Sequence, residues 1–147
     1  MTVITTNKRA YFDYEILETY EAGLKLLGFE TKAVRDGRMN LSGSFVVIRG
    51  NEAFLLNASI PPYQPKNTPG DYDPMRTRVL LLHKKEIRTL TGKTAEKGLT
   101  LVPLRVYNKG TRLKLEFGVA RHKKKHDKRE TIKKRETERE IRRDFHV

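Results

Sequence analysis

Histidines and closely spaced carboxylates are the side chains in this sequence that could support catalysis or metal binding. His122 and His126 are four residues apart, a spacing that places two imidazoles on one helix face, but the many basic residues around them would repel a dication. Asp71 and Asp73 lie in a proline-rich stretch, where an aspartate before a proline is typical of a turn. There is no cysteine, and no glycine-rich phosphate loop. We therefore expect no metal, no cofactor and no enzymatic activity.

Positive charge is the strongest chemical signal in the chain. The 147 residues include 31 Lys and Arg against 18 Asp and Glu, a net charge of +13, and residues 121–129 alone hold six basic residues and one acidic residue. Neutralising phosphates releases counterions, so such a run favours binding to nucleic acid. The sequence lacks a membrane-length apolar run, and residues 1–6 are too short for a signal peptide. The composition predicts a cytoplasmic protein that binds a polyanion and no membrane.

The end of the chain differs from the rest in its charge pattern. Residues 121–147 are too poor in apolar side chains to offset the entropy of ordering. Pairs such as Glu130 with Lys134 favour a helix, but each contributes only about 0.2–0.5 kcal/mol, so the helix is marginal in water. We expect an RNA-binding domain over residues 1–120 and a basic tail over 121–147 that is loose when free and becomes helical when a phosphate-lined channel orders it.

Within the domain the apolar pattern is mainly that of β-strands. Alternation predicts strands over residues 11–20, 44–49, 52–56, 77–82, 99–107 and 111–120, with hairpin turns at 50–51 and 108–110 and with Leu113, Leu115, Phe117 and Val119 on one face. Helices are expected over 29–35 and 83–97, and an exposed loop over 61–74. Gly23 suggests a bend in the first strand, or its end. About six short antiparallel strands with flanking helices predict a mainly β fold, a small closed barrel of the oligonucleotide-binding type.

Seven stretches of the chain, taken in order, are similar to those of one known family. They are Asn7-Lys8-Arg9-Ala10, Tyr20-Glu21-Ala22-Gly23, Thr31-Lys32-Ala33-Val34-Arg35, Asp73-Pro74-Met75-Arg76-Thr77-Arg78, residues 80–87, Val102-Pro103-Leu104 and His126-Asp127-Lys128-Arg129. By their order and spacing the chain resembles the small protein B family, the SsrA-binding proteins of bacterial trans-translation, along nearly its whole length. That family has an oligonucleotide-binding-type barrel, in agreement with the strand pattern.

The resemblance implies a function in ribosome rescue. Proteins of this family bind the tRNA-like domain of transfer-messenger RNA and deliver it to ribosomes stalled without a codon in the decoding site. The barrel contacts the RNA, and the tail lies as a helix in the empty mRNA channel of the small subunit, near the decoding centre. The expected partners are therefore transfer-messenger RNA and the ribosome, and we expect the chain to be a monomer.

Two sets of residues are predicted to carry these contacts. The RNA-binding set is Glu21, Lys32, Arg35, Arg76, Arg78, Leu81, His83, Lys84, Lys85, Lys123, Lys124 and Lys125. The ribosome-binding set in the tail is His126, Asp127, Lys128, Arg129, Lys133, Lys134, Arg135, Arg139, Arg142 and Arg143. The family usually has Gly-Lys-Lys after the last strand, whereas this chain has His122-Lys123-Lys124.

Two other functions fit a basic barrel with a charged tail. One is a general tRNA- or single-strand-binding protein in ribosome assembly, and the other is a subunit of an RNA-modifying enzyme. Selectivity for a tRNA-like RNA without a full anticodon arm would exclude the first. Turnover by the pure protein would be needed for the second.

Overall fold

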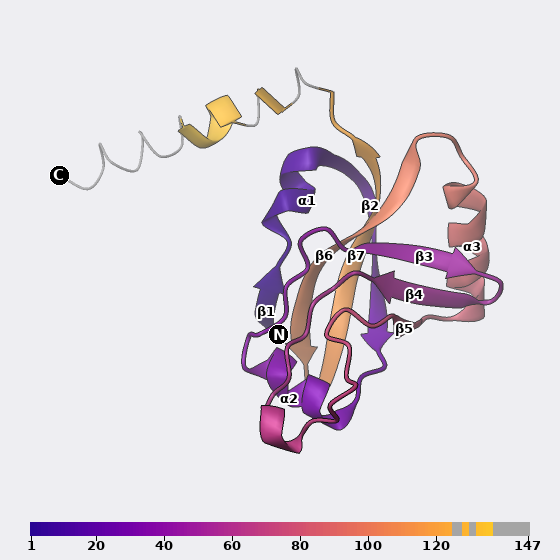
Figure 1. Ribbon diagram of the computed structural model, residues 1–147. Helices are drawn as coiled ribbons and strands as arrows, with labels where there is room; N and C mark the ends of the chain where they lie inside the picture. Colours follow the sequence, from indigo (N-terminus) through magenta and orange to yellow (C-terminus); the bar gives the residue numbers. More distant parts are fainter. Residues whose placement is uncertain (125–127, 130–131, 137–147) are drawn as a thin grey trace.

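Antiparallel strands with flanking helices make up the computed structural model of the protein, which describes residues 1–124, 128–129 and 132–136 (Figure 1). The strands are β1 (Thr2–Thr6), β2 (Tyr14–Leu24), β3 (Phe45–Arg49), β4 (Glu52–Leu56), β5 (Arg78–Leu81), β6 (Leu99–Lys109) and β7 (Arg112–His122). The helices of the domain are α1 (Lys8–Asp13), α2 (Gly28–Arg35) and α3 (Lys84–Thr94), with a 3-10 turn at Pro65–Asn67, and residues 132–136 of the tail are also helical. In Figure 1, α1 and α2 lie at opposite ends of the sheet.

The strands form a closed ring. Their order is β1-β6-β3-β4-β5-β2-β7, and β7 also pairs with β6, which closes the ring over six strands. The predicted mainly β fold with a closed set of about six strands is therefore confirmed. Closure leaves few free strand edges, and β1 covers part of β6 from outside the ring.

The predicted hairpins and core face are also confirmed. The β3–β4 turn contains Gly50 at φ +60° and the β6–β7 turn contains Gly110 at φ +63°, a backbone region that favours glycine. Leu113, Leu115, Phe117 and Val119 of β7 are all buried. They pack in one core with side chains of the other strands and of α2 and α3, which fixes the outward direction of the polar residues between them.

The first predicted strand is wrong at its start. Residues 11–13 end helix α1, and β2 begins only at Tyr14 and runs on through Gly23 to Leu24. Ala10 of α1 packs in a second apolar cluster with Val102 and Ala120, and Arg9 pairs with Asp13 one helical turn away. This tertiary packing outweighs the strand-like alternation of the aromatic residues.

Other element ends shift by a few residues. The strand expected over 77–82 is observed over Arg78–Leu81, the helix over 83–97 is observed over Lys84–Thr94, and the helix over 29–35 begins one residue earlier, at Gly28. Over the described residues, none of the helices has both the length and the apolar character needed to cross a membrane.

The last strand extends beyond the predicted domain boundary at residue 120. Tyr14 and Glu15 of β2 pair with His122 and Arg121 of β7, and the Tyr14 and His122 rings lie 4.3 Å apart between centroids. The Lys123 backbone N–H then donates to the Asp13 carbonyl at 2.9 Å. The folded part of the chain therefore reaches Lys123.

Candidate nucleic-acid interface

A surface hollow of about 720 Å³ lies where β2, β5, β7 and the start of α3 meet. We call it the β2–β5 hollow; its lining includes Glu21, Gly23, Arg35, Leu81, His83 and Lys114. Four of these, Glu21, Arg35, Leu81 and His83, were predicted as RNA-binding residues from the sequence. The fold therefore brings together residues that are up to 62 positions apart in the chain.

Strand pairing explains how this hollow forms. Gly23 pairs with Leu81 of β5 on one side and with Lys114 of β7 on the other. A Cβ at Gly23 would lie 3.2 Å from the Leu81 Cβ, so the glycine allows a close approach of the two strands. Leu81 itself is 57% exposed, unusual for a leucine in a strand. It offers an apolar surface on which a nucleotide could pack.

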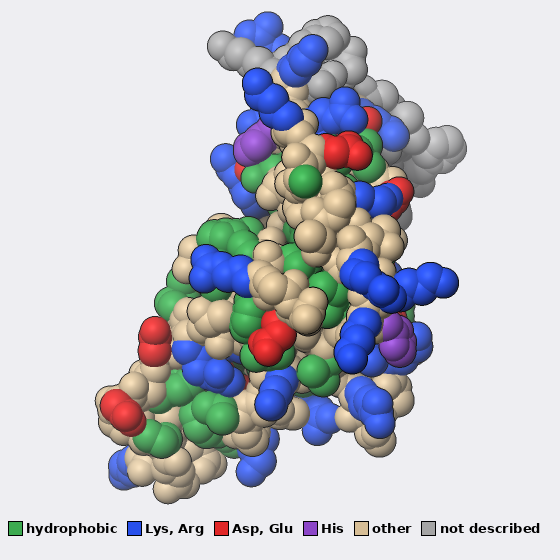
Figure 2. Space-filling model, turned by 90° about the vertical axis from the view of Figure 1, so that its right-hand side faces the viewer, with side chains coloured by type: hydrophobic (Ala, Val, Ile, Leu, Met, Phe, Trp, Pro, Cys, Tyr) green, Lys and Arg blue, Asp and Glu red, His purple; other side chains and the backbone are tan. Residues whose placement is uncertain are grey.

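The start of α3 adds positive charge beside the hollow. His83 is the N-cap of α3, and its backbone N–H donates to the Glu86 carboxylate at 3.2 Å. Lys84 and Lys85 follow in the first helical turn, and all three side chains are exposed. A helix N-terminus attracts phosphate oxygens, and two lysines there strengthen the attraction. Figure 2 shows the face of the molecule on the α3 side, over which lysine and arginine side chains are spread.

Glu21 is the acidic member of this basic surface. Its carboxylate accepts a hydrogen bond from the buried Tyr107 hydroxyl and pairs with Lys109 Nζ at 3.2 Å. The hydrogen bond from Tyr107, with further contributions from Lys109 and Lys114, lowers the pKa of Glu21. The side chain is 35% exposed. Glu21 is thus ionised at neutral pH and open to a hydrogen-bond donor from a ligand.

The side chains of Arg35 and Lys32, both on α2, lie in different surroundings. Arg35 is exposed, and its guanidinium donates to the Thr111 carbonyl at 2.8 Å, which holds it at the edge of the β2–β5 hollow. Lys32 is also exposed but lines a separate hollow of about 290 Å³ with Phe29 and Tyr63. The structure does not place Lys32 with the other predicted contacts.

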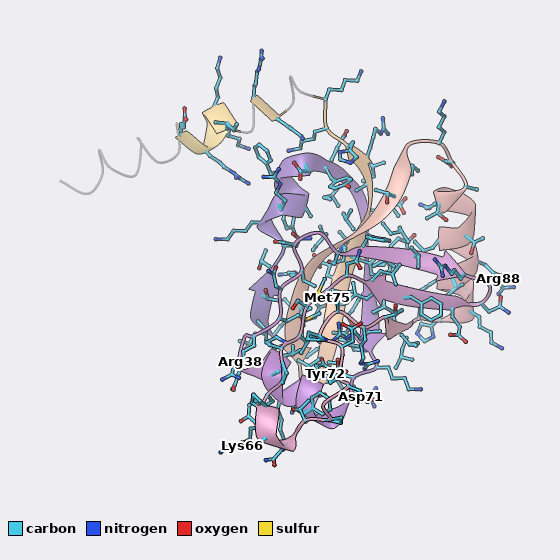
Figure 3. All side chains as sticks on the ribbon, viewed as in Figure 1. Arg38, Lys66, Asp71, Tyr72, Met75 and Arg88 are labelled. Atoms are coloured by element: carbon cyan, nitrogen blue, oxygen red, sulfur yellow. The ribbon has the colours of Figure 1, made fainter. Side chains whose placement is uncertain are left out.

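Arg78 was predicted as an RNA-binding residue, but the structure places it inside the protein. Its side chain has no exposed surface, and it donates to the Glu30 carboxylate at 2.6 Å and to the Ala58 carbonyl at 2.6 Å. Arg76 is 30% exposed and also pairs with Glu30, which has no exposed surface. The hydroxyl of Tyr72, which is labelled in Figure 3, donates to the same carboxylate at 2.8 Å.

We call Glu30, Tyr72, Arg76 and Arg78 the Glu30 cluster. These contacts stabilise the fold and do not present Arg78 to a ligand. Burial raises the pKa of Glu30, but hydrogen bonds from Arg76, the Leu27 backbone, Arg78 and Tyr72 lower it to about 2. A buried arginine with its donors used inside the protein cannot reach a phosphate.

The beginning of the tail contacts α1. Lys123 Nζ donates to the Tyr11 carbonyl at 3.1 Å, and Lys128 Nζ lies 3.2 Å from the Asp13 carboxylate. Lys128 and Arg135 also lie 5.8 and 5.9 Å from the Phe12 ring centroid. These residues surround the exit of the tail from the domain.

The other predicted tail residues divide into two groups. Lys124, Arg129, Lys133 and Lys134 are exposed, and residues 132–136 are helical. Lys125, His126, Asp127, Arg139, Arg142 and Arg143 lie outside the residues that the structure describes.

Sequence reasoning missed Arg112 and Lys114, which line the β2–β5 hollow from β7. The sequence does carry a signal for these two residues. They alternate with the core residues Leu113 and Leu115 along the strand and must therefore face outward. Across the three described stretches of the chain, no group of three or more His, Cys, Asp and Glu side chains could hold a metal ion.

Comparisons with known proteins agree with the resemblance seen in the sequence. A family model described as "SmpB protein" matches residues 4–147. The SsrA-binding protein of Geobacillus kaustophilus is 54% identical over 143 residues, covering 97% of this chain and 92% of that protein. The SsrA-binding protein of Thermosynechococcus vestitus is 52% identical over 141 residues, covering 96% of this chain and 93% of that protein.

A solved structure has the same fold over most of its length. It is described as "tmRNA-SmpB: a journey to the center of the bacterial ribosome", with a TM-score of 0.68 and 46% sequence identity, and the match covers 90% of this chain and 95% of that chain. Because the family model and these relatives span nearly the whole chain, the protein belongs to the SmpB family of SsrA-binding proteins.

Proposed function

We propose that the chain binds the tRNA-like domain of transfer-messenger RNA and delivers it to stalled bacterial ribosomes in trans-translation. The observation that carries this proposal is the match to SsrA-binding proteins at more than half identity over nearly the whole chain. The β2–β5 hollow supports it physically, because a carboxylate, an exposed leucine and several cations meet there. Cations neutralise phosphates, while Glu21 and Leu81 suit ribose and base.

The tail has a separate role in this proposal. It probes the empty mRNA channel and the decoding centre, where its lysines and arginines neutralise ribosomal RNA phosphates and the helix becomes complete. The helical residues 132–136 and their charge pattern support such a helix. The domain then captures the RNA while the tail reports that no message occupies the channel.

The chain acts in this role as a cytoplasmic monomer without enzymatic activity or cofactor. A general tRNA-binding protein of ribosome assembly is the alternative, because a basic hollow of this kind would also bind an ordinary tRNA elbow. Selectivity between the two RNAs separates these functions.

The test compares binding of the full chain to two RNAs at equal ionic strength. One is the isolated tRNA-like domain of transfer-messenger RNA, and the other is an intact tRNA of the same aminoacyl type. We expect clearly tighter binding to the tRNA-like domain, and tagging of a truncated peptide when the chain is added to a purified translation system stalled on a non-stop message. Equal affinity for both RNAs, with no tagging, would contradict the proposal and favour the alternative.

A further inference from the structure

Tyr107 is a buried residue that contacts the β2–β5 hollow through Glu21, one of the residues that line it. It lies on β6, is 2% exposed, and donates a hydrogen bond to Glu21 of β2 across the intervening strand β7. The Arg105 guanidinium lies 5.3 Å from the Tyr107 ring centroid and pairs with Glu116 at 3.2 Å. The phenol is thus held in place from its own strand and from β7, and it is too enclosed to touch a ligand itself.

Glu21 has two partners of different kinds. Tyr107 is buried and has few rotatable bonds, whereas Lys109 is 61% exposed and reaches the two carboxylate oxygens at 3.2 and 3.4 Å. An exposed lysine on a flexible stem gives little orientation. The buried phenol therefore sets the direction of the carboxylate, and Lys109 mainly balances its charge.

A ligand can still bind to this carboxylate. Its two oxygens offer about four acceptor positions, of which Tyr107 takes one and Lys109 is shared between the oxygens. Part of the side chain remains exposed in the hollow. A ribose hydroxyl or a base amino group is the kind of donor that fits an ionised acceptor, whereas a phosphate is repelled.

We propose that Tyr107 is a positioning residue of the RNA interface: by its hydrogen bond from β6 it holds the Glu21 carboxylate in the orientation that accepts a ribose or base donor of the bound RNA. This inference rests on the proposed function, because it concerns the same hollow. The bond also contributes to the lowered pKa of Glu21, which keeps the group an acceptor at neutral pH.

The substitution Tyr107→Phe removes the hydroxyl and keeps the ring. We expect the full-length variant to bind the tRNA-like domain about tenfold more weakly, the usual scale for one hydrogen bond to a charged group. The matched control is Tyr20→Phe, because the Tyr20 hydroxyl also donates to a glutamate of β2, Glu18, at 3.1 Å and outside the hollow. The control should keep wild-type affinity.

A double substitution separates positioning from a general loss of structure. In the Glu21→Ala background, which has no side-chain acceptor for the Tyr107 hydroxyl and is itself expected to bind weakly, Tyr107→Phe should cause no further loss, because its effect passes through the carboxylate. Wild-type affinity of Tyr107→Phe, or an equal further loss in the Glu21→Ala background, would overturn the proposal.

A carboxyl titration followed by NMR tests the geometry without RNA. In the wild-type chain the Glu21 carboxyl should titrate below its ordinary range, and Tyr107→Phe should move the titration upward, while Tyr20→Phe leaves it in place. An ordinary titration in the wild type would overturn the proposal even if Tyr107→Phe did not fold. If the wild type fails to prefer the tRNA-like domain while the Glu21 titration is lowered as expected, the proposed function is wrong and the positioning of Glu21 still holds.

Discussion

At the scale of single residues, the Glu30 cluster shows how an ionised group is kept inside this protein. The carboxylate has no exposed surface, yet it accepts hydrogen bonds from Arg76, Arg78 and Tyr72, which come from the loop and strand after residue 71. Burial and the bond to Glu30 raise the pKa of Tyr72 to about 12, so this hydroxyl stays a donor. Such a site is stable only when all its members are present, because one unpaired buried charge is strongly destabilising.

We predict that Glu30→Gln lowers the free energy of unfolding by about 3–5 kcal/mol at neutral pH, because it leaves buried Arg78 without a counter-charge. The pKa of Glu30 is lowered from 4.5 to about 2 by folding, so its contribution is complete above pH 4.5 and is lost as the pH falls through 2. Urea unfolding between pH 2 and 5 measures this. The wild type should lose clearly more stability over that range than Glu30→Gln.

The solvent-exposed pair of Glu18 with Lys93 provides the control, since Glu18→Gln should change the free energy of unfolding far less than Glu30→Gln does. Equal effects of the two substitutions would contradict the role assigned to Glu30. The sequence could not separate Arg78 from Arg76, because both are basic and lie two residues apart in one matching stretch. Both pair with Glu30 of α2, and they differ in burial, because only Arg78 lies fully inside the protein, where it also donates to the Ala58 carbonyl.

At the scale of elements, local patterns predicted the hairpins, the core face of β7 and the two later helices. They failed where tertiary packing decides. Residues 2–6 are all β-branched, a usable strand signal, but only pairing with β6 makes them a strand. Helix α1 is too short to be seen in a periodicity and depends on the packing of Ala10. The β2–β5 hollow was accessible to prediction only through the family resemblance, because no local pattern brings Glu21 to Leu81.

Two glycines in different elements should respond in opposite directions to alanine. At Gly118 of β7 a Cβ would lie 2.8 Å from Ile16 Cγ2 and 3.1 Å from the Glu18 carbonyl oxygen, so β2 would have to shift. At Gly92 of α3 nothing lies within 4 Å. We expect Gly118→Ala to destabilise by about 1–3 kcal/mol and Gly92→Ala to stabilise by about 0.4–1 kcal/mol.

Chemical denaturation of both variants tests this pair. Each acts as the control of the other, because the chemical change is the same and only the surroundings differ. A Gly118→Ala variant as stable as the wild type would show that the β2–β7 contact is looser than the structure indicates.

At the scale of the whole molecule, the net charge of +13 should make RNA binding strongly dependent on salt. Lys84 begins α3 beside the β2–β5 hollow, whereas Lys97 follows the opposite end of that helix. We expect Lys84→Gln to reduce the slope of log affinity against log salt by about 0.7–0.9, and Lys97→Gln to leave it nearly unchanged. Equal slopes for both variants would show that RNA affinity depends on the total positive charge and not on where the lysine lies.

The tail should be separable from RNA capture by cutting the chain after Lys124. This cut keeps all of β7 and the bond from Lys123 to Asp13, and the shorter chain should fold with its core intact. The removed residues 125–147 hold nine basic and six acidic residues, a net of +3, so the remaining chain keeps +10 of the +13. We expect it to bind the tRNA-like domain with only a modest loss, and to fail in tagging on stalled ribosomes.

Scrambling residues 125–147 at constant composition distinguishes geometry from charge. The scrambled tail carries the same charge but loses the spacing of opposite charges at i,i+4 that favours a helix. It also moves Lys128 and Arg135 away from the positions at which they contact Phe12. If order matters, the scrambled chain should bind the tRNA-like domain as the wild type does and still fail in tagging. Full tagging by the scrambled chain would show that the tail works only as a basic tether, because any arrangement of its charges would then suffice in the mRNA channel.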